Sequence, residues 1–76
     1  MTDQQTMKQK LSFVSLCIDR AAKKIGCAEE EMYSRLKQHN LIEGYLLEYY
    51  DTLHTQSIEY AVDDLLQALY HREGKE

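Results

Sequence analysis

Residues 45–57, YLLEYYDTLHTQS, are the stretch that decides how this chain folds. They hold three of the six tyrosines and one histidine, and their helical spacing of apolar residues stops after Leu53. Thr55 and Ser57 are residue types that accept a hydrogen bond from the first turn of a helix. The stretch therefore predicts a joint at residues 52–57, where one helix ends and another begins.

The sequence on both sides of this joint has the three-and-four spacing of apolar residues that is typical of amphipathic helices. After the joint, the stripe from Ile58 to Leu69 predicts a final helix. Before it, a third helix is expected to start at Leu41 or Ile42 and to run to Leu53, with an acidic outer face.

Two further helices are expected nearer the N-terminus. In residues 4–25 the apolar side chains recur at intervals of four and three, and Gly26 is expected to stop this helix in the left-handed conformation. The members of that stripe are Met7, Leu11, Val14, Ile18, Ala21 and Ile25. The second helix opens with three glutamates after Ala28 and is expected to end near His39, because Asn40 tolerates the left-handed conformation.

The fold class predicted by these patterns is all-α. The chain has no proline and only three glycines, which argues against a sheet-rich or disordered chain. We expect a single helical domain over residues 1–76, built as a small bundle or orthogonal array of about four short amphipathic helices. The alternative is three helices, with the last two continuous through Leu53.

The cysteines and the apolar runs bear on the cellular compartment. Cys17 and Cys27 would lie roughly 15 Å apart along one helix, which is too far for a disulfide, and free thiols fit a reducing cytosol. No apolar run has the length of a membrane span or a secretory signal. We expect a cytoplasmic protein.

The three histidines have no partners at ligand spacing, so neither a metal nor a cofactor is expected.

Asp51, His54 and Ser57 supply the acid, imidazole and hydroxyl of a nucleophilic triad. A triad also needs an oxyanion hole and a substrate cleft, and so short a chain has little wall left for one. We favour a structural interpretation, in which Asp51 and His54 end the third helix, the imidazole is hydrogen-bonded at the joint, and Thr55 and Ser57 cap the next helix. No catalytic residue is assigned, and the protein is expected not to be an enzyme. A small hydrolase or transferase using the three residues is the alternative.

A second alternative is weak DNA binding. The second helix, the turn at Asn40 and the third helix have the outline of a helix-turn-helix. The third helix, however, carries Glu43, Glu48 and Asp51 and no lysine or arginine, so it would repel phosphates. Nucleic acid is therefore not the favoured partner.

Charge and tyrosine content favour a protein partner. Residues 1–26 hold five basic and two acidic side chains, whereas residues 27–76 hold four basic and eleven acidic ones. We expect the two parts to neutralise each other across the fold, and the alternative is a basic face kept for a partner. Tyrosine is also favoured where an apolar body and a polar tip meet another protein.

The segment YYDTLHTQS at residues 49–57, followed by Tyr60 and by VDDL at 62–65, resembles a family of short bacterial all-helical proteins catalogued as a domain of unknown function. The shared motif is YD-x-LHT-x-S, and Asp51, His54 and Ser57 match it. The resemblance implies a small cytosolic protein without assigned activity. Because such proteins are often encoded near ADP-ribosyltransferase-like proteins, it also implies an accessory or antitoxin-like binding role.

The sequence thus predicts a non-catalytic protein-interaction or accessory module that does not enter membranes. Its partner is expected to be another protein or a second copy of the chain, as a homodimer. The joint supplies the residues of the candidate interaction site, which are Tyr49, Tyr50, Asp51, His54, Thr55 and Ser57.

Overall fold

The computed structural model describes the backbone of residues 2–74 and the side chains from Met7 to Gly74. Its elements in chain order are α1 (Thr2–Ile25), α2 (Glu29–Gln38), the π-helix η1 (Ile42–Leu47), α3 (Tyr50–Leu53) and α4 (Ile58–Glu73). The described residues contain no strand. The predicted all-α class is therefore confirmed.

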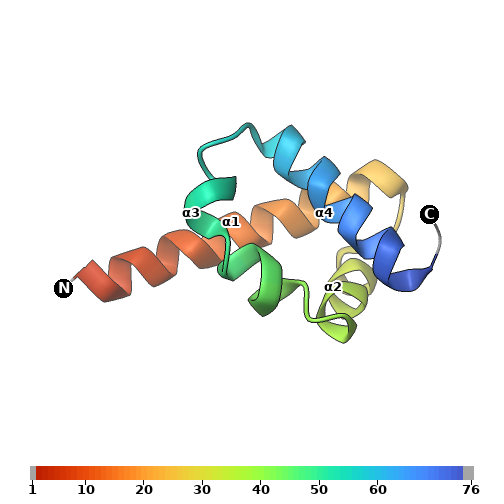
Figure 1. The fold of residues 1–76 in the computed structure, drawn as a ribbon, viewed down its shortest axis with the longest axis horizontal. Coiled ribbons are helices and arrows are strands. Elements are labelled where there is room, and N and C mark those ends of the chain that lie inside the picture. Colours follow the sequence, from red (N-terminus) through yellow and green to blue (C-terminus); the bar gives the residue numbers. More distant parts are fainter. Residues whose placement is uncertain (1, 75–76) are drawn as a thin grey trace.

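The C-terminal half of α1 is the element on which the others pack. α2, η1 and α4 all contact it, and α4 crosses over it in Figure 1. Its buried face includes the small side chains Cys17, Ala21 and Ala22, each exposed by 1% or less, together with Val14 and Ile18. Small residues let neighbouring helix axes approach closely.

The first half of α1 lies outside the core. Figure 1 shows it extending beyond the other helices toward the N-terminus, and Met7 and Leu11 are 50% and 53% exposed. The expectation that the whole stripe from Met7 to Ile25 faces a shared interior is wrong for this half. About half of each of these two side chains therefore remains open to solvent.

Left-handed residues stop the first two helices, as the sequence predicts. Gly26 has φ 78° and Asn40 has φ 58°. At Asn40 the Leu41 N–H donates to the Leu36 carbonyl at 2.8 Å, while the Asn40 N–H donates to the Lys37 carbonyl at 3.1 Å. These two bonds form a Schellman motif, which turns the chain sharply back toward the core. The second helix ends at Gln38, with His39 as its cap.

The expected continuous third helix is wrong. Residues 42–47 form a π-helix instead, in which the Leu46 N–H donates to the Leu41 carbonyl five residues earlier, at 3.0 Å. A Cβ on Gly44 would lie 2.7 Å from the Asn40 side-chain amide nitrogen. Glycine thus lets the Asn40 amide lie directly against the widened turn. Only the four-residue α3 follows it.

A true joint separates α3 from α4. Ser57 is extended, with ψ 153°, and its Oγ accepts a hydrogen bond from the Tyr60 N–H at 3.2 Å. This contact is an N-cap that starts α4. The alternative layout, with the last two helices continuous, is wrong because this extended backbone interrupts them.

Ion pairs hold the helices together at the surface. From α1, Arg20 pairs with Glu59 at 3.3 Å and Lys24 pairs with Asp63, both on α4. Arg35 on α2 donates two hydrogen bonds, from Nε at 2.8 Å and from Nη2 at 2.7 Å, to the carboxylate of Glu73 at the end of α4. The expected neutralisation therefore occurs for the C-terminal half of α1.

Among the described residues, no helix is both long and apolar enough to cross a lipid bilayer.

Leu46 is fully buried on η1, so replacing it with alanine should leave a cavity. We expect Leu46→Ala to lower the free energy of unfolding in urea by about 2 to 5 kcal/mol. Leu16→Ala is the matched control because Leu16 is 41% exposed, and it should cost less than about 1 kcal/mol. Equal losses in the two variants would contradict the described core.

The two cysteines are free and should differ in reactivity. Burial raises the pKa of the Cys17 thiol to about 11, so almost no thiolate exists at pH 8. Cys27 is only partly buried. We expect the Cys27 thiol to react promptly with a disulfide reagent in the native protein, and the Cys17 thiol to react only after denaturation. Cys27→Ser should remove the prompt reaction, and a persisting prompt reaction would show that Cys17 is accessible.

Candidate functional site

A concave surface runs between η1–α3 and α4. Both segments pack on α1 but meet each other only weakly, which leaves a trough between them. One part of it has a volume of about 510 Å³ and an adjoining part about 620 Å³, and the two share Tyr45, Asp64, Ala68 and Arg72. We call this continuous surface the tyrosine groove. Its defining residues are Tyr45, Tyr49, Gln56, Asp64, Ala68 and Arg72.

Two tyrosines form the η1 wall of the groove. Tyr45 and Tyr49 lie one turn apart, with ring centroids 5.8 Å apart and the rings inclined at 61°, an edge-to-face pair. Tyr49 is 50% exposed. Burial, aided by nearby Asp64, raises the pKa of Tyr45, so its hydroxyl stays protonated at neutral pH. The wall therefore offers aromatic surface together with a neutral hydroxyl.

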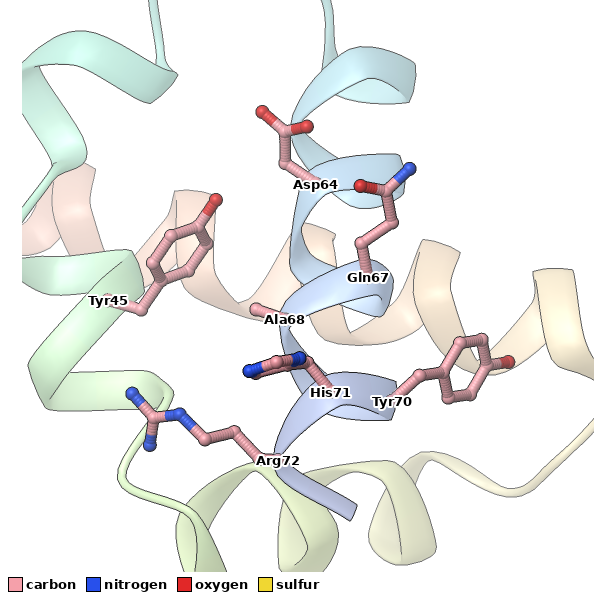
Figure 2. Close-up of a pocket in the computed structure, with 7 residues that line it drawn as sticks. All are labelled: Tyr45, Asp64, Gln67, Ala68, Tyr70, His71 and Arg72. Atoms are coloured by element: carbon pink, nitrogen blue, oxygen red, sulfur yellow. The ribbon is translucent and has the colours of Figure 1, made fainter. Parts of the chain in front are cut away.

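The α4 wall carries opposite charges at its two ends. Figure 2 shows Asp64 and Arg72 on α4 with Ala68 between them, and Tyr45 facing them from η1. Arg72 is fixed in place because its Nη1 donates to the His39 carbonyl at 2.9 Å. A carboxylate at one end and a guanidinium at the other would orient a bound segment by its own charges.

Gln56 contributes an unsatisfied polar atom to the groove. Its Oε1 is buried without a hydrogen-bond partner among the described residues, and the side chain lines the groove beside Thr52 and Leu53. An unpaired buried acceptor costs about 1 to 3 kcal/mol and is uncommon in folded proteins. Because this oxygen is shielded from solvent, a bound N–H could satisfy it only after the Gln56 side chain turned toward the groove.

The six predicted site residues lie at the start of α3, within it and in the joint to α4, and of these only Tyr49 lines the groove. The His54 ring is exposed and stacks on Tyr50, with centroids 4.4 Å apart and planes at 9°. This stack replaces the hydrogen bond expected for the imidazole. Thr55 Oγ1 donates to the Thr52 carbonyl at 2.7 Å, and Ser57 caps α4.

The three triad candidates are not assembled as a triad. Among the described residues no hydrogen bond joins the side chains of Asp51, His54 and Ser57, and the Ser57 Oγ already accepts the cap bond. All three side chains are exposed. This geometry has no base positioned to activate the hydroxyl.

The helix-turn-helix outline also changes in the structure. The six-residue π-helix η1 follows Asn40 where a recognition helix would lie, and it carries Glu43 without a basic residue. A recognition helix needs several successive turns to reach base edges. The geometry therefore gives no support to reading DNA with this segment.

Most residues of the tyrosine groove were not singled out by the sequence patterns. Asp64, Ala68 and Arg72 recur every four residues, so they share one face of α4. That spacing was a usable signal for the α4 wall. On the opposite wall the sequence singled out Tyr49 but not Tyr45, which lies in the π-helix, where the 3.6-residue period is broken.

Fold and groove together define a small all-α protein with a charged, tyrosine-lined surface trough. Residues 12–72 match the model of a family described as Protein of unknown function (DUF3791), and the chain belongs to this family. The match covers all the groove residues and the joint. Neither the curated proteins nor the solved structures that were searched gave a match.

Ser57 should stabilise the start of α4 through its cap bond. We expect Ser57→Ala to lower the free energy of unfolding by about 1 kcal/mol, because the Tyr60 N–H loses its acceptor. Ser57→Asp keeps an acceptor at the cap and is the matched control, so its stability should stay within about 0.5 kcal/mol of the wild type. Thermal or urea unfolding measures both, and an unchanged Ser57→Ala variant would contradict the cap.

Proposed function

We propose that this protein is a non-catalytic interaction module that binds a segment of a partner protein in the tyrosine groove. The observation that carries the proposal is the edge-to-face pair of Tyr45 and Tyr49 on the groove wall, with Tyr49 50% exposed. Tyrosine, with its apolar ring and polar tip, is enriched at the residues that dominate binding energy in protein interfaces.

The chemistry of the groove favours a partner segment with an apolar anchor, a basic residue toward Asp64 and an acidic residue toward Arg72. The apolar floor includes Leu41, Leu53 and Ala68, and Asp64 lies at one end. Residues 27–76 as a whole are rich in carboxylates, so a basic segment would be steered toward this side of the molecule. An accessory or antitoxin-like role, in which the segment belongs to an enzyme, is one form of this function.

A hydrolase or transferase is the weaker proposal. Catalysis by Asp51, His54 and Ser57 would require the cap bond of Ser57 to break and His54 to leave its stack on Tyr50. Binding in the groove requires neither change.

The test has two stages. Tagged wild-type protein is used to select peptides from a random displayed library and to capture stoichiometric partners from its native cell. The affinity of a selected peptide or purified partner is then measured by calorimetry for wild type, Tyr49→Ala and Tyr60→Ala. Tyr60 is the matched control because it is 55% exposed and lies on α4, whereas Tyr49 is 50% exposed in the groove.

We expect Tyr49→Ala to weaken binding at least 10-fold, or by about 1.4 kcal/mol. Tyr60→Ala should change it less than about 3-fold, and raising the salt concentration should weaken binding by the wild type. Equal losses in the two tyrosine variants would place the binding surface elsewhere. Failure to obtain any ligand from library and cell would count against an interaction module.

A further inference from the structure

The first half of α1 presents an apolar stripe that begins in the core and continues outside it. Val14 and Ile18 are buried, whereas Leu11 and Met7, the next members toward the N-terminus, are about half exposed. Figure 1 shows this part of α1 extending beyond the other elements. A continuous exposed apolar surface of this kind is typical of an interaction site.

A second groove lies beside the stripe, between α1 and α2, and is separate from the tyrosine groove. It has a volume of about 650 Å³, and its lining includes Leu11, Val14, Ile18, Tyr33, Glu29 and Glu30. Tyr33 is 45% exposed. The floor is therefore apolar and the α2 side is acidic.

The acidic side of this groove has more carboxylates than cations. Glu29 shares a hydrogen bond with Asp19, and the closeness of the two carboxylates raises the pKa of Glu29. Lys23 approaches Asp19 at 3.4 Å from a largely exposed position. Glu30 has no ion pair with the side chains that the structure describes. A further cation at this point would be stabilised.

The same chain carries such a cation beside its apolar stripe. Lys8 lies on the flank of α1 that also holds Ser15 and Asp19, because separations of seven and eleven residues are about two and three helical turns. It is exposed and forms no ion pair within the described part of the chain. In contrast, Arg20 and Lys24 are already paired with α4.

We propose that the occupant of this surface is a second copy of the chain, with the two α1 helices antiparallel and a two-fold axis near Leu11. Met7 of each copy then lies over the groove of the other, near Val14. Lys8 of each copy falls on the side where α2 of the other presents Glu30. A two-fold interface makes every such contact twice, so apolar and charged partners are matched by one arrangement.

One molecule supplies both halves of each contact, so the surface is complementary to a second copy of itself. Met7, Lys8 and Leu11 precede the stretch that matches the family, so the inference concerns this chain and does not depend on ligand binding in the tyrosine groove. Only one exposed helical half and one shallow groove are covered on each side. We therefore expect an interface at the small end of the range, below about 1,200 Å² in total, and a dimer of micromolar affinity.

Sedimentation equilibrium over about 10 μM to 1 mM tests this arrangement. Wild type should be in a monomer–dimer equilibrium, and Leu11→Glu should weaken the dimer more than 10-fold. Leu16→Glu is the matched control, since Leu16 is also exposed on α1 but lies outside the second groove, and its dimerisation should equal that of wild type. Circular dichroism verifies that each variant is folded.

A charge exchange tests the orientation. Lys8→Glu and Glu30→Lys should each weaken the dimer, because every intermolecular contact then joins like charges. An equimolar mixture of the two variants should recover wild-type affinity, since both contacts in the mixed dimer join opposite charges. A monomeric wild type at about 1 mM, an unaffected Leu11→Glu variant, or a mixture no stronger than its components would overturn the proposal.

Discussion

Close packing on the small side chains of α1 is the interaction on which the rest of the structure depends. Cys17, Ala21 and Ala22 are almost fully buried, and α2, η1 and α4 all contact this helix. A chain of 76 residues can bury only roughly 60% of the surface that its unfolded form exposes. Because α2, η1 and α4 all pack on the same helix, the limited buried surface forms one continuous core.

This arrangement also creates the tyrosine groove. Since η1 and α4 are both held by α1 and only weakly by each other, their facing sides remain open. The π-helix turns Tyr45 toward α4, and the orphan Gln56 Oε1 lies at the α3 end. π-Helical turns are rare and occur frequently at functional sites, and the groove is where this one places its tyrosines.

The second consequence is the uncovered half of α1. The buried residues of α1 begin at Val14, and Tyr50 of α3 packs on Phe13, so the apolar stripe continues past the core at Leu11 and Met7. The basic residues divide in the same way. Arg20 and Lys24 neutralise α4, whereas Lys8 remains beside the exposed stripe. In the C-terminal half of α1 the basic residues Arg20 and Lys24 form ion pairs within the molecule. In the N-terminal half, Lys8 is left for a contact with another molecule.

The sequence by itself determined the helical class, the left-handed stops at Gly26 and Asn40, and the Ser57 cap, because each depends on local spacing or on the backbone preference of one residue. Tertiary structure alone decided that η1 is a π-helix, that His54 stacks on Tyr50, and which half of the α1 stripe is buried. It also brought Tyr45, Gln56 and Arg72 to one groove. Periodicity identifies the apolar face of a helix, but only the positions of the other helices decide whether that face is covered.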